Sequence, residues 1–197
     1  MVTNDGICPW AVAPPENRRY HDEEWGVPVV DDVAILEKLC LEGFQSGLSW
    51  LTILRKRDAF RRAFRGFAPD AVAAFGARDI ERLLADASIV RHRGKIEAAV
   101  ANARAVREMH AGGESLAALV WRHEPHAGSA PRTVAELPAS TQESTALSKE
   151  LRRRGFRFVG PTTAYAAMQS LGLVNDHLAG CPARARVDAL RAALVRP

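Results

Sequence analysis

The chain lacks the features that mark secreted, membrane-spanning or disulfide-linked proteins. Its 197 residues include three cysteines, and no two of them form a C-x-x-C pair. An odd number of widely spaced cysteines argues against a disulfide framework and favours a reducing compartment, so we expect a cytoplasmic protein. No apolar run approaches the roughly 18 residues of a membrane span, and the N-terminus lacks the apolar core of a secretory signal.

Alternation of apolar and polar residues with a period of two, the pattern of half-buried strands, is almost absent. Apolar residues instead recur every three or four positions, as at Leu36, Leu39 and Cys40 behind the candidate caps Asp31 and Asp32. Residues 1–30 look irregular apart from a turn near 20–25, and 123–132 reads as a surface loop. The pattern predicts an all-α fold in a single domain over 1–197, with further helices over about 51–64, from 69 to before 76, 79–86, 95–110, from Ser140 or Thr141 to 155, 161–170 and, at the frayed tail, 187–194.

The charge balance is modestly basic, with 27 Lys and Arg against 23 Asp and Glu. The basic residues gather in three clusters, which are Arg55-Lys56-Arg57 with Arg61-Arg62, Arg91-His92-Arg93 with Lys95, and Arg152-Arg153-Arg154 with Arg157. Each cluster could contact phosphate, and each could equally be the solvated face of a helix. Three such clusters favour a polyanionic partner.

Four potential metal ligands lie at the two ends of the chain: Cys8, His21, His177 and Cys181. Two cysteines and two histidines complete a tetrahedral zinc set and leave no open position for substrate, so the site would be structural. The spacing of His177 and Cys181 places both on one side of a helix end, whereas the proline-rich stretch between Cys8 and His21 reads as a loop. Alternatively Cys8 is a surface thiol and the histidines are ordinary polar residues.

The stretch from Arg154 to Ala167 reads as a hairpin between two helices. The first helix ends at Gly155, and the second begins near Pro161 with Thr162 and Thr163 in its first turn. Free amides at such an N-terminus bind anions, and Gly160 lets a phosphate approach the backbone. The alternative is an ordinary corner between two helices, in which the glycine only permits the turn.

Several longer blocks of the chain resemble the 3-methyladenine DNA glycosylase I family, within the helix-hairpin-helix DNA glycosylase superfamily. The blocks cover nearly the whole chain from residue 8 to about residue 181, and they are Cys8-Pro9-Trp10, Tyr20 to Pro28 (YHDEEWGVP), Leu41 to Trp50 (LEGFQSGLSW), Ile89 to Ile96 (IVRHRGKI), Leu147 to Gly155, Phe156 to Tyr165 (FRFVGPTTAY) and Gly172 to His177 (GLVNDH). Their length and unusual composition make the resemblance more specific than any single motif.

The resemblance implies a helix-hairpin-helix fold whose two ends are joined by structural zinc. It assigns the zinc ligands to Cys8, His21, His177 and Cys181, in segments of about 1–30 and 172–185. It also implies that the hairpin, about 147–170, binds the DNA backbone through Gly160, Thr162 and Thr163. The implied partner is double-stranded DNA that contains alkylated purines, and the expected oligomeric state is a monomer.

The resemblance further implies a base-binding pocket. Glu42 is its catalytic carboxylate and hydrogen-bonds the base edge, while Tyr20 and Trp50 are aromatic walls that attract a cationic base. Glu42 and Trp50 would be about 12 Å apart on one continuous helix, so both reach one base only if the chain bends near Gly47. Without the resemblance, Glu42 reads as a solvated helix residue, and Trp50 and Tyr20 as packed aromatics.

Two positions depart from related sequences. Asn175 stands where many glycosylases of the superfamily have a catalytic aspartate, an absence shared by the 3-methyladenine family. Asp176 is adjacent, but one step along a helix turns a side chain by about 100°, so it need not replace that aspartate. Asn17 stands where relatives commonly have a tyrosine that faces the base, and it cannot stack, so no pocket role is carried over to residues 14–19.

The resemblance therefore implies a monofunctional glycosylase that extrudes 3-methyladenine from alkylated DNA and hydrolyses its glycosidic bond, with 3-methylguanine as a further candidate base. No lysine occupies a recognised nucleophile position, so strand cleavage is not expected. Two alternatives stay open at this point. One is a non-catalytic DNA- or damage-binding module with the same hairpin and zinc, and the other is a zinc hydrolase with an open metal position.

Overall fold

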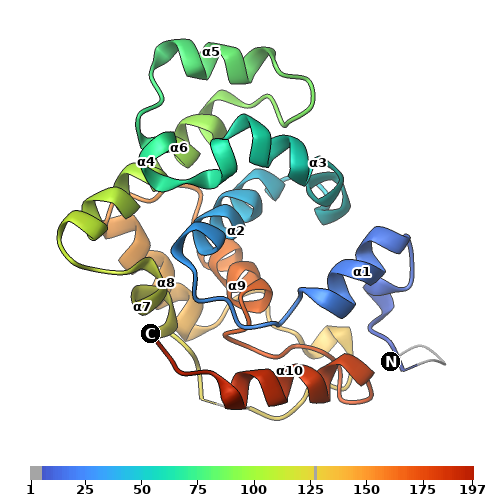
Figure 1. Ribbon diagram of the computed structural model, residues 1–197. Helices are drawn as coiled ribbons and strands as arrows, with labels where there is room; N and C mark the ends of the chain where they lie inside the picture. The colour runs from blue at the N-terminus through green and yellow to red at the C-terminus, as the bar shows by residue number, and fades with distance from the viewer. Residues whose placement is uncertain (1–5, 127) are drawn as a thin grey trace.

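The computed structural model describes residues 6–126 and 128–197, and every regular element within these ranges is helical (Figure 1). The prediction of an all-α fold is therefore confirmed. None of these helices combines the length and the apolar character that crossing a membrane requires. The elements are η1 (Pro9–Ala11), α1 (Pro15–Glu23), α2 (Asp32–Gln45), α3 (Trp50–Ala63), η2 (Arg65–Phe67), α4 (Pro69–Ala73), α5 (Ala77–Ala85), α6 (Arg93–Ala111), α7 (Leu116–Trp121), η3 (Val134–Glu136), α8 (Gln142–Arg153), α9 (Pro161–Ser170) and α10 (Pro182–Ala193).

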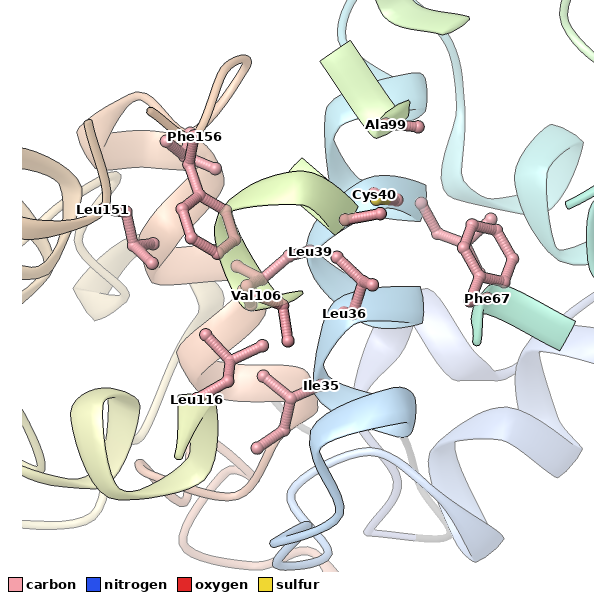
Figure 2. Packing of buried hydrophobic residues seen from close by; sticks show 14 of the residues in the cluster. Ile35, Leu36, Leu39, Cys40, Phe67, Ala99, Val106, Leu116, Leu151 and Phe156 are labelled. Carbon is pink, nitrogen blue, oxygen red and sulfur yellow. The ribbon is translucent and has the colours of Figure 1, made fainter. Parts of the chain in front are cut away.

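Helix α2 lies at the centre of the molecule and packs against α3, α6, α7 and α9. Asp31 caps its first turn by accepting a hydrogen bond from the Ala34 amide at 2.8 Å. The apolar face behind this cap is fully enclosed, with Ile35, Leu36 and Leu39 meeting side chains from α6, α7 and α8 (Figure 2). Because α2 is anchored on several sides, residues near its C-terminal end have fixed positions.

The chain bends sharply between α2 and α3, as the arrangement of Glu42 and Trp50 requires. Gly47 adopts a positive φ of 80°, which glycine tolerates without steric cost. The buried Lys95 donates hydrogen bonds from Nζ to the carbonyl oxygens of Phe44 at 2.9 Å and Ser46 at 2.5 Å. These bonds satisfy carbonyls at the end of α2 that have no partner within the helix. Lys95 of the second basic cluster is thus a structural residue.

Helices α8 and α9 form the expected hairpin. Gly155, at φ 91°, follows the last turn of α8, and the Phe156 amide donates back to the Leu151 carbonyl at 3.0 Å, the pattern of a Schellman motif. Asn102 of α6 holds the turn from outside: its Oδ1 accepts from the Arg157 amide at 2.7 Å, and its Nδ2 donates to the Arg157 carbonyl at 3.3 Å. The hairpin is therefore rigidly attached to the core.

The two ends of the chain are more helical than the sequence pattern predicts. Residues expected to be irregular form α1, and the C-terminal helix α10 begins at Pro182, where a residue without an N–H donor fits the first turn. Helix α10 lies beside the N-terminal segment (Figure 1), and Arg186 donates to the carbonyl of Asp22. Both predictions failed because contacts between the ends stabilise these helices, and such contacts leave no local pattern.

Smaller corrections concern helix starts. Helix α5 begins at Ala77, two residues before the predicted start, with Gly76 as its N-cap. Helix α8 is capped by Thr141: the Ser144 amide donates to Thr141 Oγ1 at 3.1 Å, and Ser144 Oγ accepts from the Thr141 amide at 2.8 Å. Helix α7 was not predicted, because it spans only six residues.

Candidate active site and metal cluster

A cavity of about 390 Å³ lies between α1, the bend from α2 to α3, and α9. Tyr20 reaches it from α1, Glu42 from the last turns of α2, and Trp50 from the first turn of α3. The structure therefore brings together the three pocket residues named from the sequence. Its remaining walls are Trp10, Asn17, Trp25, Gln45, Ser49, Leu51, Leu137, Ala166 and Gln169.

Aromatic rings make up much of the wall. The ring centroids of Tyr20 and Trp50 are 5.1 Å apart, with their planes inclined at 49°. Trp10 packs edge-on against Trp25 at 5.0 Å and tilts against Tyr20 at 6.3 Å. The negative faces of such rings attract a flat cation, so the cavity suits a positively charged heterocycle. Trp10 and Trp25 lie inside the blocks that resemble the family, but no role in the pocket was predicted for either residue.

Glu42 supplies the acidic group of the cavity. Its side chain is 6% exposed, and burial raises the pKa of its carboxyl from 4.5 to about 7, while the positive charge of Lys38 opposes this rise. Both protonation states are therefore accessible near neutral pH. A cation bound in the cavity would favour the carboxylate, because opposite charges attract strongly in a buried site.

Lys38 lies one helical turn before Glu42 on α2, and the sequence did not single it out. Its ammonium is 5.5 Å from the centroid of the Tyr20 ring. Burial lowers the pKa of Lys38, and the nearby carboxylate of Glu24 counteracts that effect. Lys38 thus places a positive charge behind the wall of the cavity, where it acts on Glu42.

The four predicted metal ligands also come together. Cys8, His21, His177 and Cys181 are all buried, and their ligand atoms lie within 4.8 Å of one another. Within the cluster, the distances are 3.0 Å from His177 Nδ1 to His21 Nε2, 3.4 Å from Cys181 Sγ to His21 Nε2, 3.6 Å from Cys181 Sγ to His177 Nδ1, and 4.0 Å from Cys8 Sγ to His177 Nδ1. The cluster could hold a metal ion.

The remaining ring nitrogens of the two histidines bind fixed acceptors. His177 Nε2 is 3.0 Å from the Trp25 carbonyl oxygen, and His21 Nδ1 is 2.7 Å from Asp22 Oδ1. If both nitrogens donate, neutral rings present two lone pairs to each other at 3.0 Å, which is unfavourable unless a cation or a proton is shared. The donor set therefore fits a metal.

The prediction that His177 and Cys181 lie at a helix end was wrong. His177 and Cys181 do not lie on a helix, since residues 173–181 form the irregular segment that precedes α10. Helical rotation therefore does not set the orientation of Asp176. Its carboxylate is held by hydrogen bonds that it accepts from Tyr165 Oη at 2.6 Å and Gln169 Nε2 at 2.7 Å. Asn175 donates to Asp188 Oδ1 at 2.7 Å.

The N-terminus of α9 presents the features of an anion site. Gly160 is its N-cap, Pro161 has no N–H, and the amides of Thr162 and Thr163 belong to the first turn, where no carbonyl of the helix reaches them. The helix dipole adds partial positive charge at this end. Phe158, at a positive φ of 55°, is 41% exposed beside it.

Most residues of the three basic clusters are engaged within the protein. Ion pairs join Arg55 to Glu16, Arg57 to Glu24, Arg61 to Glu37, Arg93 to Glu81 and Arg154 to Glu114. Within the described ranges, four clustered arginines have no acidic partner, namely Arg62, Arg91, Arg152 and Arg157. Two of these, Arg152 and Arg157, flank the hairpin, so the third cluster keeps positive charge near the start of α9.

Comparison with known proteins gives consistent matches over most of the chain. The profile of the methyladenine glycosylase family matches residues 10–185. DNA-3-methyladenine glycosylase 1 of Escherichia coli (strain K12) is 50% identical over 177 residues, which are 88% of this chain and 94% of that protein.

Solved structures agree with the sequence matches. A crystal structure of 3-methyladenine DNA glycosylase I superposes with a TM-score of 0.87 at 46% identity, covering 89% of this chain and 98% of the other. A variant of 3-methyladenine DNA glycosylase I in complex with 3-methyladenine superposes with a TM-score of 0.86 at 34% identity, covering 91% of this chain and 97% of the other.

Proposed function

The chain belongs to the methyladenine glycosylase family, and from this membership we infer that it is a monofunctional DNA-3-methyladenine glycosylase of base excision repair. The enzyme hydrolyses the bond between 3-methyladenine and its deoxyribose. The observation that carries this conclusion is the convergence of Tyr20, Glu42 and Trp50 on one aromatic cavity, in a chain half identical to a glycosylase of that name.

The chemistry of the substrate explains why such a cavity suffices. Methylation at N3 makes the purine cationic and weakens its glycosidic bond, so the leaving base needs no protonation. The enzyme must extrude the nucleotide, which costs less for a damaged base, and hold the base while water attacks the sugar. We assign the aromatic walls to Tyr20 and Trp50, and the hydrogen bond to the exocyclic amino group to Glu42, whose carboxylate also favours the cation.

We propose that the metal cluster binds zinc. Two sulfur and two nitrogen donors are a typical zinc set, and tetrahedral bonds of about 2.0–2.3 Å place ligand atoms about 3.3–3.8 Å apart, close to the separations in this cluster. Cys8, His21, His177 and Cys181 would fill all four positions, so zinc would stabilise the fold and would not activate water. This argues against a zinc hydrolase.

We further propose that α8 and α9 are a helix-hairpin-helix element that grips one DNA strand. Gly160 and the amides of Thr162 and Thr163 would bind a phosphate without reading sequence, and Arg152 and Arg157 would add attraction. The whole chain, 1–197, would act as one glycosylase domain, as a monomer in the cytoplasm, with alkylated double-stranded DNA as its partner.

The function is tested by incubating purified protein with methylated duplex DNA and separating the freed bases by chromatography. We expect 3-methyladenine above the spontaneous background, with 7-methylguanine retained and the DNA strand uncut. 3-Methylguanine in the same chromatogram would define the second substrate. Folded protein that binds alkylated duplex tightly but frees no base would instead be a binding module.

A further inference from the structure

Phe158 is an exposed aromatic residue in the turn of the α8–α9 hairpin. Its side chain is 41% exposed, and among the large hydrophobic side chains exposed in the described part of the chain it is the only aromatic one. Its backbone lies in the left-handed region, at φ 55°, which is unfavourable for a bulky residue. Strain of this kind persists where the surroundings impose it, and it clusters at functional sites.

Neighbouring elements hold the turn in this conformation. Asn102 of α6 binds both the amide and the carbonyl oxygen of Arg157. The turn also packs closely on α2 at Gly43, where an added Cβ would lie 3.2 Å from Phe158 Cβ. The Phe158 ring meets the His92 ring edge-on, with the ring centroids 6.2 Å apart. The position of the Phe158 ring is therefore set by α2, by α6 and its cap, and by the hairpin together.

Positively charged side chains accompany the ring. Arg157 precedes it in the chain, Arg91 precedes the histidine that the ring contacts, and both arginines are exposed without an acidic partner in the described ranges. Arg152 Nη2 would lie 3.5 Å from a Cβ added at Gly160, two residues after Phe158. A surface that offers cations and one apolar ring fits a polyanion that also has apolar faces. A DNA strand has this character, because its deoxyribose rings alternate with phosphates.

We propose that the Phe158 ring packs against the apolar face of a deoxyribose in the DNA strand that the hairpin binds. The inference rests on the proposed function. Two residues of chain span at most about 7 Å, so the ring can reach the sugar next to a phosphate bound beside Gly160. A phenyl ring offers no hydrogen bond to a phosphate oxygen, so it contacts the carbon–hydrogen face of the sugar and reads no sequence.

The test measures the affinity for labelled duplex DNA by fluorescence anisotropy over a range of salt concentrations. Phe158→Asn removes the ring, and asparagine tolerates a left-handed backbone. We expect this variant to bind duplex about three- to ten-fold more weakly, because an apolar contact is lost. The slope of log affinity against log salt should stay the same, because the ring neutralises no phosphate.

Three comparison variants make the result specific. Phe158→Tyr keeps the ring and should bind duplex as the unaltered protein does. Arg152→Ala should reduce the salt slope by about one, as expected when a cation at a phosphate is lost. Leu190→Asn alters a side chain of α10 with a matched exposure of 40%, and it should bind duplex normally. Phe158 does not line the base cavity, so free 3-methyladenine should quench tryptophan fluorescence equally in Phe158→Asn.

Duplex affinity in Phe158→Asn equal to that of the unaltered protein, or a changed salt slope, would overturn the proposal. Phe158→Gly, which also tolerates a positive φ, provides a second variant without the ring. If the unfolding temperatures of both variants fell by more than about 5 °C, the ring would be a structural residue of the turn, which would overturn the proposal as well. Failure of the proposed function is distinguishable, because the unaltered protein would then free no 3-methyladenine from methylated DNA, whatever its affinity for duplex.

Discussion

At the scale of single residues, the buried carboxylate of Glu42 destabilises the fold but favours the binding of a cationic base. Its carboxyl is buried and has a pKa of about 7, above the ordinary 4.5. The protonated form is therefore favoured by the fold, so the stabilising contribution of Glu42 is complete below pH 4.5 and is lost as the pH rises through 7. At higher pH the fold carries a buried carboxylate, which a cationic base can stabilise.

Replacing Glu42 by Gln removes this ionisation. We expect Glu42→Gln to have the larger free energy of unfolding at pH 8.5, by about 3 kcal/mol, with the difference shrinking towards pH 5.5. Urea unfolding at the two pH values measures it, with Glu23→Gln, an exposed change at the end of α1, as control. If the free energies of unfolding of the two proteins differed by the same amount at both pH values, the pKa of Glu42 would not be raised in the folded protein.

Lys38 should act on the reaction through Glu42. Loss of its positive charge in Lys38→Met removes the influence that holds the pKa of Glu42 down, so less carboxylate is present in mildly acidic solution. We expect the acidic limb of the kcat/KM profile for release of 3-methyladenine to move to higher pH, with a larger loss of rate at pH 6 than at pH 8.5. Lys38→Arg keeps the charge and should leave the profile in place. If the pH profile of kcat/KM were the same in Lys38→Met as in the unaltered protein, Lys38 would not act on the reaction through Glu42.

The pocket residues show what a sequence can supply at this scale. Resemblance named Tyr20, Glu42 and Trp50, and helical spacing added the need for a bend near Gly47, which the structure contains. Lys38 could not be found in this way. Its significance depends on burial and on the placement of α1 against α2, and neither leaves a trace in local spacing.

At the scale of elements, the α8–α9 hairpin is where the chain should hold DNA. A methyl group at Gly160 would lie 3.5 Å from Arg152 Nη2, an ordinary contact, and the residue has φ −62°, so the fold accommodates alanine. The methyl group would nevertheless obstruct a phosphate that approaches the backbone.

We therefore expect Gly160→Ala to weaken binding of duplex DNA about ten-fold, since hydrogen bonds to a charged group are lost, while the free energy of unfolding falls by at most about 1 kcal/mol. Fluorescence anisotropy with labelled duplex measures the affinity. Gly76→Ala alters another glycine N-cap, that of α5, in open space, and should bind DNA normally. If both variants bound duplex DNA with equal affinity, the α8–α9 hairpin would not be part of the surface that binds DNA.

Helices with strong local signals were predicted well. α2, α3, α6 and α9 have caps, periodic apolar residues or terminal glycines, and they begin or end within about two residues of their predicted limits. Helix α1 was missed and helix α10 was predicted too short, because both helices are stabilised by contacts between the two ends of the chain around the metal cluster. The spacing of His177 and Cys181 predicted a helix end for the same reason, because local spacing carries no information about long-range contacts.

At the scale of the whole molecule, the metal cluster joins the segment from Cys8 to His21 with the segment from His177 to Cys181, and His21 and His177 are 156 residues apart in the chain. Removing the proposed zinc would leave buried thiols and facing imidazoles, so the two ends should separate from the core. After chelation we expect a lower unfolding temperature and faster hydrogen exchange in α1 and α10, with α2 and α6 still protected. Purified protein without metal, or unchanged exchange after chelation, would contradict the assignment.

The cavity is likewise a property of the whole fold, because its walls come from α1, the α2–α3 bend and α9. The most direct test of its role is the single-turnover rate of 3-methyladenine release from methylated duplex by the unaltered protein and by Trp50→Ala. Loss of a stacking wall predicts a rate about ten- to a hundred-fold lower, with Leu190→Ala, a remote exposed change on α10, unaffected. Release by Trp50→Ala at the unaltered rate would mean that the base is excised elsewhere.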